Sequence, residues 1–534
     1  MIDYSKKRFL VVDDFSEFRT SVIGMLRLMA VRQADSAPRG EDAIAMCRNT
    51  QYDVILHDYN LGAGKNGQQV LEELHHLKLI SPHCIFVMCT AESSQAMVMS
   101  ALECEPDAYL TKPFNRASLQ QRLDKLVERK TALKPILDAL AKQDHRAVLA
   151  ACEKVTLEHK RFAPQCLRYQ ANALKALGQR AELEKLLQAQ VTDRPMPWAL
   201  IALGNLWLEQ GKLEQALELF RSAISQFPML PALFDGLAAV MAAMGEPKQA
   251  QEYIEQGIKI SPNSLQRQQS LGKLAKANGD FDNAVRAYRQ AVDLGQNSQF
   301  RDPESHLGLA ASLNEQAGDQ APNPRAVLEI RKTLGDLGKS WKGDANLQVR
   351  AQLMEASTLI KTGDQREADK LIQQASTQLG ELDTFFSAEV ALEVAGQLKA
   401  LGQEEQASGI LHTCAEMYGD DAKVMQSIAE QTDDPAILNG GKAAQELNRQ
   451  GIRLYQQKQF AEALPLFREA QAMQPRNISF ALNTAQSLLR MLLGQPDPEL
   501  KAQCLECLDQ VRSMPASDAR YERYQKLCNT VTGL

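Results

Sequence analysis

The first 130 residues contain short apolar runs separated by longer stretches of mixed polarity. The runs cover residues 8–12, 52–57, 84–89 and 107–111. Runs of this length without alternation are typical of strands that are buried on both faces, as in a parallel sheet covered by helices above and below. We therefore predict an α/β, doubly wound parallel sheet for residues 1–128.

Beyond about residue 130 the strand pattern ends, and Ala, Leu, Gln and Glu dominate, which favours helix. Equivalent residues recur there at a spacing of 34. This spacing is the period of the tetratricopeptide repeat (TPR), a helix–turn–helix unit that stacks on its neighbours. The recurring positions are Leu203, Leu237 and Leu271; Gly211, Gly245 and Gly279; Ala216, Ala250 and Ala284; and Phe220, Ile254 and Tyr288.

Residues 129–534 thus resemble a TPR protein, which implies an all-α superhelix. The repeats are clearest over residues 197–296. The segment from Thr432 to Gly441 interrupts the pattern, and we interpret it as a possible division of the array into two blocks. Weaker copies are expected at about 164–196, 301–335, 349–380, 388–420 and 444–477.

Composition narrows the functional classes. The net charge is −6, so the chain has no overall basic character for nucleic acid binding. No apolar stretch is long enough to span a membrane, and the N-terminus lacks a signal-peptide pattern, so we expect a cytoplasmic protein. Ten scattered cysteines suggest reduced thiols, and we interpret Cys504 and Cys507 as core residues rather than metal ligands.

Polar residues follow the predicted strands at the edge where such folds bind ligands. Asp13 and Asp14 follow the first run, Asp58 the second, Thr90 the third and Lys112 the fourth. Gathered carboxylates favour Mg²⁺, which prefers oxygen ligands. A carboxylate beside that cation can attack phosphorus, with the lysine as a second positive charge. Asp58, on the central strand, is the expected nucleophile.

Residues 1–128 resemble a receiver domain of the two-component response regulators, which have a flavodoxin-like, five-stranded sheet. The resemblance rests on Val11-Val12-Asp13-Asp14, Asp58, Thr90-Ala91 and Lys112-Pro113-Phe114. It implies that Asp58 accepts phosphate from a sensor histidine kinase or phosphotransfer protein. It further implies that Asp14, Asp58 and the backbone carbonyl of Asn60 hold Mg²⁺, with Asp13 acting mainly through water. Tyr109 matches the aromatic residue that moves with Thr90 on activation.

We expect a non-enzymatic response regulator whose phosphorylation switches the binding of a protein or peptide partner to the TPR surface. The alternatives are a TPR-bearing transcription regulator, or a constitutive scaffold whose receiver serves only for docking or homodimer formation. No element suited to DNA reading is evident. Three smaller expectations complete the picture. Lys65 should be solvated, Met97 and Met99 should be ordinary surface residues, and Asn205, Asn278 and Arg286 are polar positions that could line the partner surface.

Overall fold

The computed structural model describes residues 2–62, 64–91, 105–192, 195–318, 320–382, 384–494 and 497–533. The chain divides into two compact units, Met1–Ser312 and Leu313–Leu534, and we describe each by itself. Met97 and Met99 lie outside the described residues. No described helix combines the length and the apolar character that crossing a bilayer requires.

The first unit begins with a five-stranded, all-parallel sheet in the order β2-β1-β3-β4-β5, which confirms the predicted fold class. The four apolar runs form β1, β3, β4 and β5. The fifth strand, β2, lies at the edge and has the polar sequence QADSA, so its apolar signal is weak. The strands are β1 (Arg8–Val12), β2 (Gln33–Ala37), β3 (Val54–Asp58), β4 (Ile85–Thr90) and β5 (Ala108–Thr111).

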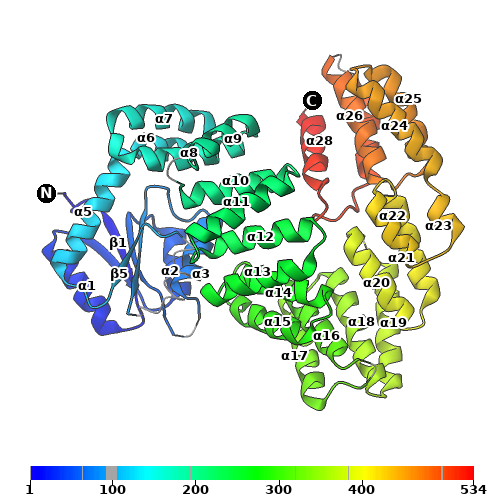
Figure 1. Ribbon diagram of the computed structural model, residues 1–534, viewed down its shortest axis with the longest axis horizontal. Coiled ribbons are helices and arrows are strands. Elements are labelled where there is room, and N and C mark those ends of the chain that lie inside the picture. Colours follow the sequence, from blue (N-terminus) through cyan, green and yellow to red (C-terminus); the bar gives the residue numbers. More distant parts are fainter. Residues whose placement is uncertain are drawn as a thin grey trace. The chain divides into compact units, whose positions relative to one another are not determined.

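Helices cover both faces of this sheet, which explains why β1, β3 and β4 are buried along nearly their whole length. On one face, α1 (Ser16–Leu28) and α5 (Arg116–Ala132) bury Leu26 and Leu123 against the strands. On the other face, α2 (Gly40–Asn49) and α3 (Gly67–His76) form a second core. Figure 1 shows this N-terminal α/β layer in blue.

One residue, Leu133, separates α5 from the first helix of the all-α region. Leu133 is buried in the core that α6 and α7 form, so the sheet domain continues into the helical array without a flexible linker. In this unit the helices after α5 are α6 (Lys134–Ala141), α7 (His145–Glu158), the 3₁₀ turn Lys160–Phe162, α8 (Ala163–Ala176), α9 (Arg180–Ala189), α10 (Pro197–Glu209), α11 (Leu213–Gln226), α12 (Pro231–Ala243), α13 (Pro247–Ile260), α14 (Leu265–Ala277), α15 (Phe281–Gly295) and the start of α16 (Pro303–Gln316).

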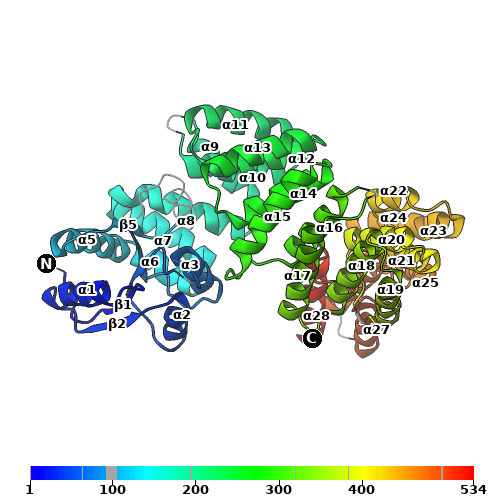
Figure 2. The ribbon, with the colours of Figure 1, turned by 90° about the horizontal axis from the view of Figure 1, so that it is seen from below.

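Successive helix pairs from α10 to α15 stack on one another, as Figure 2 shows. An aromatic ring and small residues set the close approach of these helices. Phe220 of α11 lies between Gly204 and Gly236, where a Cβ atom would come within 2.3 and 2.4 Å of its ring. Tyr288 lies in the same way between Gly272 and Gly308. The ring-and-glycine contact therefore recurs two repeats apart, with Ile254 at the equivalent position between Phe220 and Tyr288.

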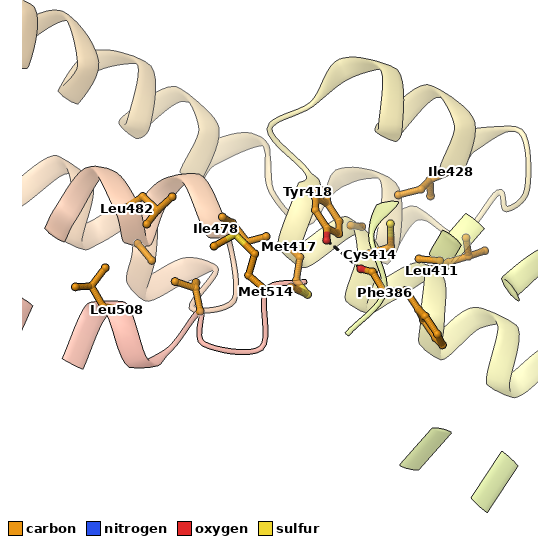
Figure 3. Close-up of a cluster of buried hydrophobic side chains, with 14 of the residues drawn as sticks. Phe386, Leu411, Cys414, Met417, Tyr418, Ile428, Ile478, Leu482, Leu508 and Met514 are labelled. Atoms are coloured by element: carbon orange, nitrogen blue, oxygen red, sulfur yellow. Dashed lines mark hydrogen bonds between the residues drawn. The ribbon is translucent and has the colours of Figure 1, made fainter. Parts of the chain in front are cut away.

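The second unit is also helical and has a large core of its own. Figure 3 shows part of that core, including the hydrogen bond of 2.9 Å that the Tyr418 hydroxyl donates to the carbonyl of Phe386. Its helices are α17 (Pro324–Ser340), α18 (Ala345–Lys361), α19 (Gln365–Gly380), α20 (Ala388–Ala400), α21 (Glu404–Tyr418), α22 (Ala422–Ala429), α23 (Pro435–Asn439), α24 (Lys442–Gln456), α25 (Phe460–Met473), α26 (Ile478–Gly494), α27 (Pro498–Asp509) and α28 (Tyr521–Gly533).

The predicted division at residues 432–441 is wrong. This segment contains the short helix α23, and its Ile437 is 4% exposed and belongs to the same core as Leu411 and Ile478. The break in the repeat pattern is therefore a short helix packed within one unit. The structure instead divides the chain between residues 312 and 313.

Replacement of Gly236 by Ala tests the ring-and-glycine contact. The added methyl group overlaps the Phe220 ring, so we expect Gly236→Ala to destabilise the first unit by about 1–3 kcal/mol. Gly24→Ala is the matched control, because Gly24 lies within α1 and a Cβ there has nothing within 4 Å. Thermal unfolding followed by circular dichroism should show a lower midpoint for Gly236→Ala alone. Equal midpoints for the two variants would contradict the packing argument.

Candidate functional site

The three predicted aspartates meet at the carboxyl edge of the sheet. Asp13 and Asp14 directly follow β1, and Asp58 is the last residue of β3. The two strands are neighbours, with Val12 opposite His57, so the next residue of each strand, Asp13 and Asp58, arrives at the same level. Carboxylate oxygens from all three aspartates lie within 4.8 Å of one another.

Lys112 lies between two of these carboxylates. Its Nζ is 2.5 Å from Asp13 Oδ2 and 2.8 Å from Asp58 Oδ2. Burial by itself would lower the pKa of Lys112, but the hydrogen bonds and charges of Asp13 and Asp58 outweigh it and raise that pKa above its usual value. The lysine therefore remains charged and offsets part of the repulsion within the cluster.

The three carboxylates differ in exposure. Asp13 is 1% exposed and Asp58 is 7% exposed, whereas Asp14 is open to solvent. Burial raises the pKa of Asp58, and Lys112 opposes that effect. One carboxylate is thus accessible from outside, while the expected nucleophile is held just below the surface.

The other predicted residues surround the cluster. Thr90 ends β4 opposite Thr111, and the backbone N–H of Lys112 donates to the Thr90 carbonyl at 2.8 Å. Tyr109 of β5 is half-buried and packs against the core under α2 and α3. Asn60 is exposed, and its Oδ1 accepts a hydrogen bond of 3.1 Å from the backbone N–H of Gly62. Their functional roles remain predictions.

Sequence reasoning missed two residues that support the site from α1. The Arg19 guanidinium donates hydrogen bonds to the backbone carbonyls of Asp13 at 2.6 Å and Asp14 at 3.1 Å. The ring of Phe18 lies 4.3 Å from Lys112 Nζ. Both residues lie in the first turn of α1, shortly after the acidic pair. This short separation in sequence is the one signal that could have identified them.

His57 is fully buried and stacked on Phe86 with ring centroids 5.6 Å apart. Its Nδ1 lies 2.6 Å from the carbonyl oxygen of Asp58. Burial lowers the pKa of His57 to about 4, so the ring is neutral near pH 7 and its Nδ1–H donates to that carbonyl. His57 therefore orients the backbone at Asp58.

The donor set of the cluster fits a hard divalent cation, because three carboxylates supply oxygen ligands at one solvent-accessible edge. In the described part of the chain, no other group of three or more potential ligands occurs. Cys504 is a buried core residue, as predicted, and Cys507 is half-buried and packs against the same core. The Cys504 thiol is buried and donates to the carbonyl of Ala485 at 3.3 Å, and burial raises its pKa to about 12.

The loop after Asp58 corrects a further expectation. Lys65 is not a solvated side chain. Its Nζ donates to the backbone carbonyl of Asn297 at 2.5 Å and forms an ion pair of 2.9 Å with Glu73. This lysine therefore connects the α/β domain to the segment between α15 and α16.

Family models match both parts of the chain. The model described as "Response regulator receiver domain" matches residues 9–124. Two models described as "Tetratricopeptide repeat" match residues 207–274 and residues 270–321 and 448–491. The matches thus cover the acidic cluster and the stacked helix pairs separately.

Individual relatives agree with these matches. Chemotaxis protein CheY-3 of Vibrio cholerae is 32% identical over 128 residues, which cover 23% of this chain and 92% of that protein. Chemotaxis protein CheY of Pseudomonas aeruginosa is 28% identical, covering 23% of this chain and 97% of that protein.

Solved structures with similar parts include a CheY-like receiver domain protein from Methanospirillum hungatei, with 25% identity over 23% of this chain and 96% of that chain and a TM-score of 0.22. A tetratricopeptide repeat protein from Parabacteroides merdae is 16% identical, covering 49% of this chain and 96% of that chain, with a TM-score of 0.36. From the receiver match and the relative at 32% identity, we conclude that the chain belongs to the response regulators, with an N-terminal receiver domain followed by tetratricopeptide repeats.

Proposed function

We propose that Asp58 accepts a phosphoryl group from a histidine kinase or phosphotransfer protein, and that its phosphorylation changes which proteins the repeats bind. The observation that carries the proposal is the pairing of Lys112 with both Asp13 and Asp58 at the edge of a receiver sheet. This arrangement places a positive charge beside a carboxylate that solvent can nearly reach, as attack on phosphorus requires.

The transfer is a displacement at phosphorus. A carboxylate oxygen of Asp58 forms the new P–O bond while the P–N bond to the donor histidine breaks, and the electron pair returns to the imidazole nitrogen. Lys112, already 2.8 Å from Asp58, can follow the negative charge onto the phosphoryl oxygens. His57 holds the Asp58 backbone through its carbonyl while the side chain reacts.

Asp14, Asp58 and the carbonyl of Asn60 are the expected ligands of Mg²⁺, with Asp13 acting mainly through water. When bound, this ion offsets charge on the transferring phosphoryl group. The exposure of Asp14 leaves room for the water ligands that Mg²⁺ usually keeps.

The repeats offer a groove for a protein or peptide partner. It has a volume of about 790 Å³ and is lined largely by the first helices of successive pairs, α10, α12 and α14. Ile201, Ala238 and Ala242 give it an apolar floor, and the buried Arg267 is fixed by two hydrogen bonds of 2.7 Å to Asp235. Asn205, Asn278 and Arg286 are not among the lining residues. An apolar floor with fixed charges suits an amphipathic segment.

On this proposal the protein is a signalling adaptor in the cytoplasm, not an enzyme that acts on a separate substrate. The acidic overall charge does not favour nucleic acid as the partner. The receiver supplies the input and the repeats supply the output. On this proposal the surface on which a kinase docks selects that kinase, and the chemistry of the acceptor carboxylate does not.

Phosphorylation of the full chain with acetyl phosphate tests the acceptor. We expect Asp58→Asn to abolish hydroxylamine-sensitive labelling, because Asp13, the other carboxylate that contacts Lys112, is more deeply buried than Asp58. Asp42→Asn is the control, since Asp42 is an exposed carboxylate paired with Arg39 at 2.9 Å. Label retained by Asp58→Asn, measured by mass spectrometry, would contradict the assignment.

Replacement of Lys112 tests whether its positive charge is needed for phosphorylation and for the change in partner binding. Lys112→Ala leaves the buried Asp13 and Asp58 without their cation, so we expect slower labelling and at least about a 5-fold loss of any phosphorylation-dependent partner binding. Circular dichroism should show an intact fold. A variant with normal labelling and normal partner switching would remove Lys112 from the mechanism.

Calorimetric titration with Mg²⁺ tests the metal assignment. Asp14→Asn removes a carboxylate ligand, so we expect its Kd for Mg²⁺ to rise at least about 10-fold. Glu17→Gln is the control, because this exposed carboxylate lies nearby in the first turn of α1. Chelation of the metal should also stop labelling of the wild type. Equal affinity of the two variants would show that Asp14 is not a ligand.

A further inference from the structure

One face of the receiver that contacts the repeats comprises residues 64–76 and is called the receiver face below. The partner of this face is the docking segment, residues 294–300, between α15 and α16. Lys65 Nζ donates to the carbonyl of Asn297 at 2.5 Å, and Asn297 Nδ2 donates in return to the carbonyl of Gly64 at 3.1 Å. The contact is thus reciprocal at its centre.

Two glutamines extend the contact along α3. Gln69 Nε2 donates to the carbonyl of Leu294 at 3.1 Å, and Gln299 Nε2 donates to the carbonyl of Glu72 at 2.8 Å. The rings of His76 and Phe300 meet edge to face, with centroids 6.4 Å apart. All four hydrogen bonds end on backbone carbonyls, so the contact depends on the backbone shape of both segments.

The loop between Asp58 and α3 links this contact to the phosphorylation site. The Tyr59 N–H donates to the carbonyl of Cys89, and the Gly67 N–H donates back to the carbonyl of Tyr59, both at 2.8 Å. Gly67 fits closely, because a Cβ there would come within 2.6 Å of the Asp58 carbonyl. Asn60, a predicted metal ligand, and Lys65 therefore belong to one closed loop.

Two further backbone N–H groups of this loop are also held. The Gly62 N–H donates to Asn60 Oδ1, and the Lys65 N–H donates to Glu41 Oε1 at 3.0 Å. A displacement at Asn60 has few ways to relax inside such a loop. Such a displacement would reach Lys65 and Gly64, whose Nζ and carbonyl oxygen contact Asn297.

The spaces around the contact support the same link. A crevice of about 250 Å³ is lined by Tyr59 and Asn60 on the receiver side and by Leu265, Leu294 and Phe300 on the repeat side. Gln68 and Glu72 of α3 border both this crevice and the larger groove along α10, α12 and α14. Movement of α3 would therefore change the wall of the groove in which we place the partner.

We propose that phosphorylation of Asp58 changes how tightly the receiver face binds the docking segment. This change in binding transmits the state of Asp58 to the repeats. This inference rests on the proposed phosphorylation of Asp58. The contact with the docking segment and the phosphoryl group both act on the loop after Asp58. Each therefore changes the equilibrium constant of the other by the same factor. The partner of the receiver face is thus residues 294–300 of this chain, and the groove beside α3 changes with it.

The experiment uses the full chain with Mg²⁺ and beryllofluoride, a phosphoryl mimic. Asn297→Ala with Gln299→Ala removes two side chains of the contact and leaves the acidic cluster intact. Gln296→Ala is the matched control, because this exposed neighbour makes no bond to the receiver among the described residues. Hydrogen exchange of peptides covering residues 64–76 and 294–300 reports the contact, and calorimetry reports beryllofluoride affinity.

We expect beryllofluoride to change exchange in residues 294–300 of the wild type and of Gln296→Ala. We expect the double variant to exchange faster over residues 64–76 and to shift beryllofluoride affinity at least about 5-fold. If beryllofluoride binds in an Asp58-dependent manner but neither quantity changes, the inference fails and the proposed function stands. If beryllofluoride binding does not depend on Asp58, both fail.

Discussion

The contact of Lys112 with Asp13 and Asp58 is the interaction on which the receiver site depends. Three carboxylates converge at one edge of the sheet, and two of them are nearly excluded from water. Without a cation such a cluster would be costly, since buried charges need partners. Lys112 follows β5, which is separated from β3 by β4, and its positive charge offsets part of the repulsion between the carboxylates. The order of the strands therefore determines which side chains meet at the site.

A second constraint, close packing around aromatic rings, organises the repeats. Phe220 and Tyr288 occupy space that exists because glycines face them from both neighbouring helices. This contact recurs after two periods of 34 residues, and Ile254 takes the place of the ring in the repeat between. The helices α22 and α23 are short and lie outside this pattern, yet Ile428 and Ile437 are buried in the core of the second unit.

The sequence allowed prediction of the sheet, the helical repeats and the convergence of the three aspartates, because buried strands and 34-residue spacing are local signals. The polar edge strand β2 gave a weak signal, since one side of it has no neighbouring strand. Arg19 and Lys65 both donate to backbone carbonyls, about which side-chain patterns carry no information, and the carbonyl that Lys65 contacts belongs to Asn297, far along the chain. The division between residues 312 and 313 also follows from contacts across the whole fold rather than from any local motif.

Leu133 is the single residue between α5 and α6. The length of this junction therefore sets the rotation of the helical repeats about the axis of α5. Inserting one residue at Leu133 would turn everything that follows by about 100° and advance it by about 1.5 Å if the helix continues. Such a rotation would carry Asn297 away from Lys65 even though neither domain had changed. A chimaera that keeps the Lys65–Asn297 contact through a rigid junction would therefore have to preserve the length of that junction. A flexible tether between the two domains would remove this requirement.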